Sequence, residues 1–213
     1  MIVTTQKPLD KVLDFVSPYH NILILGCDGC TQPPRGLREA KTLSQLLELG
    51  GKLKAKDFVF KVTTMAKQCD SYLAASMLKP QMDGVEAVLS LACGVGVQTL
   101  AGLSPEICVF PTQNTQFMGA EEREGGTLEE RCAGCGDCLL ALTGGICPVA
   151  RCSKGLLNGA CGGSKNGKCE LSPEKDCAWI LIYERLKKQD KLHYLKEFRP
   201  PRDYQLTGWK VTT

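Results

Sequence analysis

The stretch Ile22-Leu-Ile-Leu-Gly-Cys-Asp-Gly-Cys30 opens with an apolar, β-prone run and ends in glycines and cysteines. Similar short apolar runs follow at residues 58–62, 87–91 and 107–110. The segments between them have helical spacing of apolar residues, at 35–49, 70–78 and 97–103. Strands that are apolar throughout and alternate with helices are typical of a buried parallel sheet. The sequence therefore predicts an α/β fold for its first part.

The composition divides the chain of 213 residues into three parts. Residues 1–118 are predicted to form a small open parallel-sheet domain of Rossmann or flavodoxin-like type, with Leu43, Leu46, Leu47 and Leu49 on one helix face. Residues 119–130 are rich in glutamate and glycine and are predicted to be an acidic linker. Residues 131–213 are predicted to form an irregular cysteine-rich domain with a C-terminal helix, for which Ser172 is the expected N-cap and Pro173 the first helical residue.

Charge and hydropathy exclude two classes of function. The formal net charge of +3 is small, and no basic run has interleaved aromatics, so nucleic acid is not an expected partner. No apolar run approaches the roughly 20 residues of a membrane-spanning helix. The N-terminus has acidic residues and lacks a long apolar core, unlike a signal peptide. The cytoplasm is therefore the expected compartment.

The 13 cysteines are the feature that decides the chemistry. Thiols are kept reduced in the cytoplasm, so such an excess indicates metal binding rather than disulfides. Only two histidines, His20 and His193, are present. Ligation by thiolate alone favours iron–sulfur clusters or all-cysteine zinc sites.

Four cysteines in the first part follow predicted strands. Cys27 and Cys30 come directly after the first strand, Cys69 after the second and Cys93 after the third. Ligands of an open parallel sheet bind at the carboxyl ends of its strands, so these four thiols are predicted to meet there and to hold a [4Fe–4S] cluster. Gly26, Gly29, Gly94 and Gly96 are expected to bring the backbone close to the cluster.

Two other readings of this first set remain open. Cys27 and Cys30 alone would suit a thioredoxin-like redox pair, and all four thiols would suit structural zinc. Cys108 lies inside the fourth predicted strand and is expected to be a plain buried thiol. No catalytic side chain is predicted, because Asp28, Asp137 and the two histidines have no second group at a useful spacing.

The second part contains Arg131-Cys-Ala-Gly-Cys-Gly-Asp-Cys138, which has the Cys-x-x-Cys-x-x-Cys spacing of bacterial ferredoxins. We expect Cys132, Cys135 and Cys138 to share a site with Cys147 or Cys152, and the remaining thiols to form another. The five cysteines after the run are Cys147, Cys152, Cys161, Cys169 and Cys177. Either of these two sites could hold zinc instead of a cluster.

This second part resembles the cysteine-rich C-terminal domain of the methylenetetrahydrofolate reductase family. The resemblance covers residues 131 to about 195 and rests on the run above and on five further motifs. These are Thr143-Gly-Gly-Ile-Cys-Pro148, Arg151-Cys-Ser-Lys-Gly-Leu-Leu-Asn-Gly159, Cys161-Gly-Gly163, Gly167-Lys-Cys-Glu170 and Cys177-Ala-Trp-Ile-Leu-Ile-Tyr-Glu-Arg-Leu186. The first part, with Leu91-Ala-Cys-Gly94, looks like the rest of the iron–sulfur or zinc small subunit of acetogen-type reductases.

The resemblance implies a subunit that is not an enzyme on its own. The flavin and the folate site of these reductases belong to a β/α barrel of about 250 residues, for which this chain is too short. The implied role is to carry two or three [4Fe–4S] clusters and to pass electrons from a donor, such as ferredoxin or another redox subunit, to the flavin of a catalytic partner. The competing functions are a non-redox zinc adaptor of the same reductase and a thiol redox protein. Trp179, Tyr183, Trp209 and the tail from Phe198 are candidates for the contact with the partner.

Overall fold

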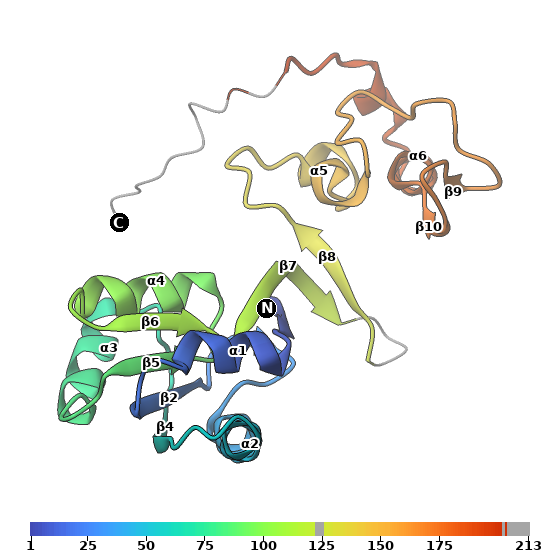
Figure 1. Ribbon diagram of the computed structural model, residues 1–213. Coiled ribbons are helices and arrows are strands. Elements are labelled where there is room, and N and C mark those ends of the chain that lie inside the picture. The colour runs from blue at the N-terminus through green and yellow to red at the C-terminus, as the bar shows by residue number, and fades with distance from the viewer. Residues whose placement is uncertain (122–125, 202, 204–213) are drawn as a thin grey trace. The chain divides into compact units, whose positions relative to one another are not determined.

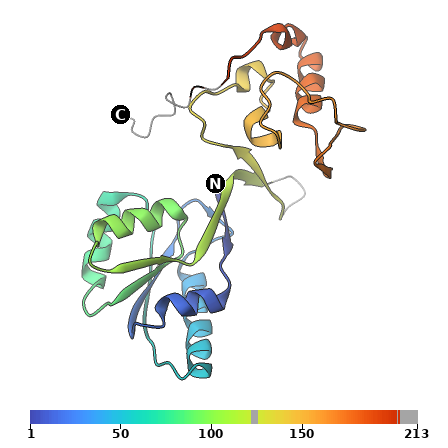
Figure 2. The same ribbon diagram turned by 45° about the horizontal axis from the view of Figure 1, so that its top comes forward.

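The computed structural model describes residues 1–121, 126–201 and 203, and it divides into two compact units. The first unit is Met1–Phe117, and the second begins at Met118. Figures 1 and 2 show the two units in two views. Each unit is described by itself below.

The first unit is built on a parallel sheet of four strands in the order β4-β2-β5-β6. The strands are β2 (Asn21–Cys27), β4 (Val59–Met65), β5 (Ala87–Ser90) and β6 (Cys108–Pro111). All three neighbouring pairs are parallel. The strand order is that of flavodoxin-like sheets. The predicted α/β class is therefore confirmed, and each predicted apolar run forms a strand.

Helices cover both faces of this sheet (Figure 1). The helices α1 (Leu9–Val16) and α2 (Leu37–Leu53) pack on one face, where Val12, Leu43 and Leu47 join Ile22 and Ile24 in one buried cluster. The helices α3 (Ser71–Leu78) and α4 (Gly94–Leu103) pack on the other face, and the 3-10 helix η1 (Lys79–Gln81) follows α3.

Two details of the first unit differ from the prediction. Leu46 and Leu49 are exposed, because they lie off the buried face of α2, which contributes Ala40, Leu43 and Leu47 to the core. The strand β1 (Ile2–Gln6) and the helix α1 were not predicted. A strand with the sequence Ile-Val-Thr-Thr-Gln lacks a continuous apolar run, so it carries no clear signal of burial.

A second sheet has the strand order β3-β1-β7-β8, with β3 (Thr31–Gln32), β7 (Gln113–Glu121) and β8 (Leu128–Cys132). The strands β7 and β8 form an antiparallel pair in which Glu121 lies opposite Leu128. The predicted linker at residues 119–130 is therefore wrong for its described residues, while residues 122–125 lie outside them. The glutamates indicated an exposed segment, but exposure is equally compatible with an antiparallel pair.

The cysteine-rich part contains short elements. They are the 3-10 helix η2 (Leu140–Leu142), α5 (Pro148–Arg151), the hairpin of β9 (Lys168–Cys169) and β10 (Ser172–Asp176), α6 (Ala178–Lys188) and η3 (Leu192–Lys196). Trp179, Ile182 and Leu186 of α6 form its buried cluster. The predicted cap at Ser172 is wrong, because Ser172 pairs with Cys169 and the helix starts five residues later with Cys177 as its N-cap.

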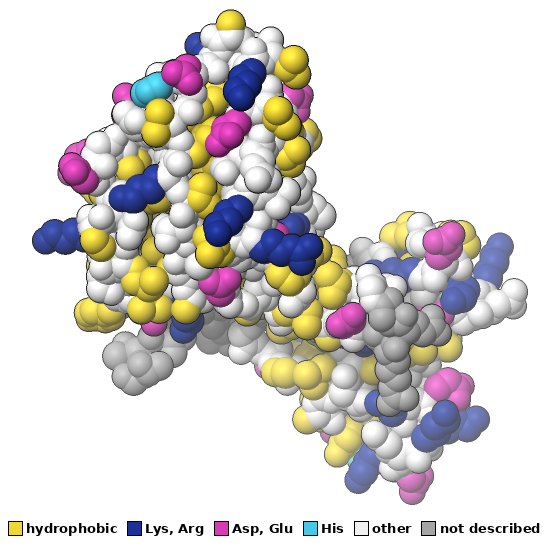
Figure 3. Space-filling model, turned by 90° about the horizontal axis from the view of Figure 1, so that it is seen from below, with side chains coloured by type: hydrophobic (Ala, Val, Ile, Leu, Met, Phe, Trp, Pro, Cys, Tyr) yellow, Lys and Arg dark blue, Asp and Glu magenta, His cyan; other side chains and the backbone are white. Residues whose placement is uncertain are grey.

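Charged side chains of both signs are mixed over the face drawn in Figure 3. No helix among the described residues is both long and apolar enough to cross a bilayer.

Candidate metal centres

The first set of cysteines lies at the carboxyl edge of the parallel sheet. Cys27 is the last residue of β2, and Cys93 lies between β5 and the first residue of α4. The register places Cys27 opposite Met65, the last residue of β4, so the strands end at the same level. The chain crosses from β4 over β2 to β5, which makes the ends of β2 and β5 a topological switch point. Ligands of open α/β sheets bind at such points.

Three of these four thiols influence one another. Cys27 and Cys93 are both 7 % exposed, whereas Cys30 and Cys69 are exposed. Partial burial raises the pKa of the Cys69 thiol, and the thiols of Cys93 and Cys27 raise it further. Cys69, Cys93 and Cys27 are therefore close enough to interact electrostatically. Cys30 lies in the connection between β2 and β3, where its carbonyl oxygen accepts a hydrogen bond from the Ile2 N–H at 2.9 Å.

The space beside Cys27 is open enough for a bound group. Cys27, Gly29 and Thr31 line a cavity of about 450 Å³ at the start of α2. The hydroxyl of Thr31 is buried and has no hydrogen-bond partner among the described residues. A buried polar atom without a partner is uncommon in folded proteins.

A buried amide that the sequence did not reveal ties this edge of the sheet together. The Gln68 side chain is fully buried, and its Nε2 donates to the carbonyl oxygens of Leu25 at 3.0 Å and Gly26 at 2.8 Å. Its Oε1 accepts from the hydroxyl of Ser90 at 2.6 Å, and the Ala92 N–H donates to that hydroxyl. Gln68 precedes Cys69 and therefore fixes the positions of the three backbone segments that carry Cys27, Cys69 and Cys93.

The four predicted glycines have different surroundings. A Cβ at Gly26 would lie 2.7 Å from the carbonyl group of Gly36, and one at Gly96 would lie 2.7 Å from the Cβ of Ala92. Gly29 lies near the Cys27 sulfur, since its Cβ would be 3.5 Å from that Sγ. The Gly94 N–H donates to the Thr115 hydroxyl at 2.8 Å. Close packing within the protein therefore explains why positions 26 and 96 are glycine. The Gly94 N–H already donates its hydrogen bond to Thr115.

Cys108 is not the buried thiol that the sequence predicted. It is exposed at the start of β6, the edge strand of the sheet, and its thiol raises the pKa of the neighbouring Tyr19 hydroxyl. The predicted strand began one residue earlier, which placed Cys108 inside it. An edge strand has a neighbour on one side only, so its first residue is easily exposed.

The eight cysteines of the second part line two separate cavities, four in each. The larger cavity has a volume of about 240 Å³ and includes Cys132, Cys135, Cys138 and Cys147 in its lining. The smaller cavity has a volume of about 20 Å³ and includes Cys152, Cys161, Cys169 and Cys177. The sequence left Cys147 and Cys152 as alternatives for the first group, and the cavity lining places Cys147 there.

Backbone N–H groups point at the sulfurs of the larger cavity. The Gly134 N–H donates to Cys132 Sγ at 3.4 Å, in a turn where Gly134 and Gly136 both have positive φ. Cys147 is the N-cap of α5, and its sulfur accepts from the Ala150 N–H at 3.5 Å. Backbone N–H groups aimed at sulfur are also the groups that surround the sulfurs of iron–sulfur clusters.

The smaller cavity lies beside the apolar cluster of the second part. Cys152 and Cys177 are half-buried against Trp179, Ile182 and Leu186. Cys169 ends β9, and backbone N–H groups, first that of Leu171, lower the pKa of its thiol. Cys161 is exposed and its thiol donates to Glu170 Oε1 at 3.6 Å.

The basic residues next to these cysteines are paired with carboxylates. Arg131 and Arg151 both bind Glu129, at 2.8 and 2.7 Å. Lys154 forms an ion pair with Glu170, and Lys168 forms one with Asp176 at 2.6 Å. Their positive charges are therefore offset locally before any metal binds.

The thiols of all three sets of cysteines are suitable donors for thiolate-bound metals. Their side chains do not converge on a common point. Within the described ranges, no three Cys, His, Asp or Glu side chains are placed to hold an ion between them. Metal binding to thiols is in general coupled to deprotonation and to local folding.

Asp28 and the two histidines, for which no catalytic role is predicted, have structural contacts. Asp28 accepts a hydrogen bond from the Thr64 hydroxyl at 2.7 Å, and His20 Nδ1 lies 2.8 Å from the Asp57 carbonyl oxygen. His193 packs against the ring of Tyr194. Each of these contacts is local and none of them joins a metal centre.

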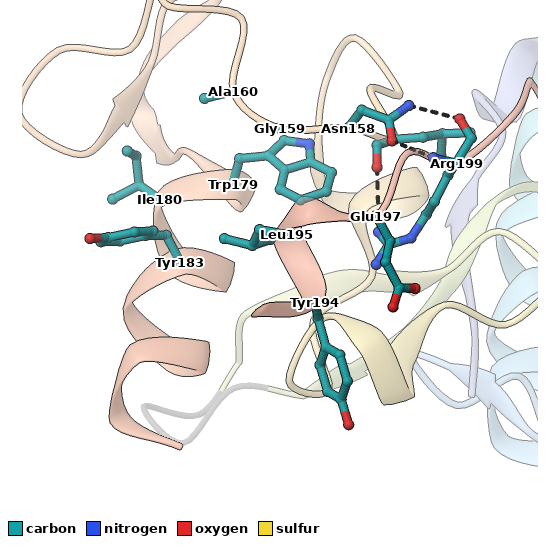
Figure 4. Close-up of a pocket in the computed structure, with 11 residues that line it drawn as sticks. Asn158, Gly159, Ala160, Trp179, Ile180, Tyr183, Tyr194, Leu195, Glu197 and Arg199 are labelled. Carbon is teal, nitrogen blue, oxygen red and sulfur yellow. Dashed lines mark hydrogen bonds between the residues drawn. The ribbon is translucent and has the colours of Figure 1, made fainter. Parts of the chain in front are cut away.

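An apolar cavity of about 200 Å³ lies between α6 and η3. Figure 4 shows Trp179 and Leu195 at its centre and Asn158 bonded to the backbone of Arg199. Trp179 is 4 % exposed and belongs to the core, whereas Tyr183 is 42 % exposed. Of the residues predicted to contact a partner, Trp209 lies outside the described ranges.

One comparison with known proteins gives a match. Residues 110–205 match the family described as Methylene-tetrahydrofolate reductase C terminal. No curated protein and no solved structure matches the chain. The matched segment holds the eight cysteines of the two cavities, and it covers less than half of the chain. This segment is therefore related to the C-terminal domain of that reductase family.

Proposed function

Starting from this similarity, we propose that the chain is an iron–sulfur electron carrier that delivers electrons to the flavin of a methylenetetrahydrofolate reductase partner. The observation that carries the proposal is the 240 Å³ cavity lined by Cys132, Cys135, Cys138 and Cys147, which lies inside the segment related to the reductase. Its first three cysteines have ferredoxin spacing.

Two sets of thiols are proposed to hold [4Fe–4S] clusters. Cys27, Cys30, Cys69 and Cys93 would hold one at the carboxyl edge of the parallel sheet. Cys132, Cys135, Cys138 and Cys147 would hold the other. When bound, such clusters supply one-electron transfer at potentials set by their surroundings.

The chain's own contribution is to direct backbone N–H groups at the sulfurs and to limit access by solvent. Cys93 is the N-cap of α4. The Gly134 and Ala150 N–H groups donate to the sulfurs of Cys132 and Cys147. Burial of Cys27 and Cys93 lowers the local dielectric, which influences the potential of any cluster held there.

The folate chemistry is proposed to belong to the partner. The flavin and folate site of these reductases is a barrel of eight parallel strands, whereas the described residues form an open sheet of four. This chain would then bind no folate and would be no enzyme by itself. Its electron donor would be a ferredoxin or another redox subunit.

Transfer to the partner is the direct test of this function. The chain is purified without oxygen, reduced with dithionite, freed of excess reductant and mixed with the flavin-containing reductase. The flavin absorbance should fall as the visible absorbance of the chain returns to its oxidised form, with protons for the reduced flavin coming from solvent. A flavin that is reduced no faster with the chain than without it would contradict the proposal.

A matched pair of variants makes this test specific. Cys135→Ser should slow flavin reduction at least tenfold, while Cys108→Ser should leave the rate unchanged, because Cys108 lines neither cavity. A colourless chain that still binds the reductase would favour the second candidate, a zinc adaptor without redox activity.

A further inference from the structure

We propose that the outer face of α2 is the surface on which the electron donor docks, and that the donor presents an apolar patch bordered by carboxylates. This docking surface rests on the proposed function, because it is where the electrons of that function would enter the chain. Each transfer moves one electron from a reduced cluster of the donor to an oxidised cluster of this chain, and no bond forms or breaks.

A stripe of exposed leucines runs along the outer face of α2. Leu46, Leu49 and Leu53 are 45 %, 60 % and 90 % exposed. Together with Thr42 they are separated by four, three and four residues, which is the spacing of the apolar seam in paired helices. The residues that α2 contributes to the core lie on its opposite face. The stripe is therefore apolar surface that packing within the first unit does not use.

Basic side chains border this stripe. Arg38, Lys41 and Lys52 are exposed, and none of them forms an ion pair within the part of the chain that the structure describes. Glu48 is also exposed and offsets part of their charge. An apolar stripe with an excess of positive charge beside it complements a partner surface that carries carboxylates around an apolar patch.

The size of the stripe suits a donor that binds briefly. Each partner of a stable protein complex buries roughly 800 Å², whereas transient redox complexes lie at the low end of interface size. Three partly exposed leucines supply only a small part of the larger area. A second copy of this chain would bring the same basic side chains to the interface. The stripe therefore fits an acidic redox protein better than a permanent partner or a second copy.

The start of α2 lies at the first set of cysteines. Leu37 and Arg38, the first two residues of the helix, line the same cavity as Cys27. Cys30 is exposed in the connection that leads from β2 through β3 to this helix. A protein seated on the outer face of α2 would therefore reach the edge of the sheet for which a cluster is proposed. The segment related to the reductase family begins at residue 110, so α2 lies outside it.

The test measures how fast a reduced, acidic bacterial ferredoxin reduces the full-length chain purified without oxygen. Leu49→Gln should lower the second-order rate constant about tenfold, because the complex loses the burial of one leucine side chain. Leu171→Gln is the matched control, since Leu171 is 61 % exposed and belongs to the second unit. Reduction by dithionite, which needs no docking, should be equally fast in both variants and wild type.

The charges beside the stripe are tested through the dependence of the same rate on salt. The wild-type rate should fall severalfold between about 0.05 and 0.5 M NaCl, because salt screens the attraction between the two proteins. The double variant Lys41→Glu, Lys52→Glu should be slower at low salt and less sensitive to salt. Lys187→Glu on α6 is the control and should behave as the wild type. A wild-type rate that does not change with salt would overturn the inference.

Failure of this inference can be distinguished from failure of the proposed function. Suppose that dithionite reduces the chain and that the chain reduces the flavin of the reductase. Equal rates with ferredoxin for Leu49→Gln and wild type, or no reduction by ferredoxin at all, would then overturn the docking surface alone. A chain that accepts no electrons from dithionite would contradict both.

Sedimentation velocity tests the other occupant of the stripe. The wild-type chain should sediment without self-association through α2, so that Leu49→Gln leaves its sedimentation coefficient unchanged. A wild-type dimer that Leu49→Gln dissociates would show that a second copy covers the stripe, and it would overturn the inference.

Discussion

The hydroxyl of Ser90 donates a hydrogen bond of 2.6 Å to Oε1 of Gln68, and both side chains are fully buried. Through this bond the end of β5 is joined to the segment that carries Cys69. Because the Nε2 of Gln68 also binds the end of β2, one amide links the three segments that carry Cys27, Cys69 and Cys93.

Gln68→Leu should therefore destabilise the first unit. The substitution removes three buried hydrogen bonds at similar side-chain volume, and a buried polar group left without its partner costs about 1–3 kcal/mol. We expect a lower urea midpoint and a loss of iron from the wild-type level. Ser76→Ala is the control, because its exposed hydroxyl bonds only to Leu73 of its own helix. Equal midpoints for Gln68→Leu and wild type would show that the network does not hold this edge.

Cys93→Ser should remove about four irons per chain, because a buried ligand of the first set is lost. Cys108→Ser is its control, since Cys108 is an exposed thiol on the neighbouring strand β6. The measurement is iron and acid-labile sulfide per chain. Unchanged iron in Cys93→Ser would contradict the assignment of the first set.

Gly26→Ala should destabilise the chain through close packing rather than through the cluster. The new Cβ would lie 2.7 Å from the Gly36 carbonyl group, which is backbone and cannot rotate away. Overpacking of this kind costs about 1–3 kcal/mol. Gly102→Ala in α4 meets nothing within 4 Å and should raise the thermal midpoint slightly. A Gly26→Ala chain as stable as the wild type would contradict the packing argument.

Glu86 should make folding stability depend on pH. Its Oε2 accepts the N–H of His20 at 2.6 Å and of Asn21 at 2.7 Å, and these bonds, that of Asn21 first, lower the pKa of the carboxyl group. A lowered folded-state pKa contributes stability above the unfolded value of about 4.3, and this contribution disappears as the pH falls through the folded value.

The measurement for Glu86 is the difference in urea midpoint between wild type and Glu86→Gln. The wild type should be the more stable of the two at pH 7, and the difference should shrink as the pH is lowered below about 4. A difference that stays constant with pH would show that the charge of Glu86 contributes nothing.

The sheet could be predicted from sequence because its central strands, β2 and β5, are almost entirely buried and therefore apolar throughout. The run at residues 22–25 lies inside β2, and the rule that ligands bind at carboxyl ends predicted where Cys27 and Cys93 lie. The burial of Gln68 could not be predicted, because a polar residue before a cysteine carries no signal of burial. Its partners, Leu25 and Ser90, are brought to it by the fold.

In the second part, strand pairing overrides the secondary structure that the local sequence predicts. The residues Ser172-Pro-Glu predict the start of a helix, yet pairing with β9 in the hairpin keeps this segment extended. Two groups of four were predicted for the eight cysteines, but which of Cys147 and Cys152 belongs with Cys132, Cys135 and Cys138 was left open. Whether Cys147 or Cys152 joins that run depends on the turn at α5, which places the two thiols at different cavities.

The most direct test of the electron-carrier account is the content of iron and acid-labile sulfide in the wild-type chain purified without oxygen. Two [4Fe–4S] clusters predict about eight of each per chain, together with a brown colour that fades on reduction. A chain that contains neither iron nor sulfide would contradict the account.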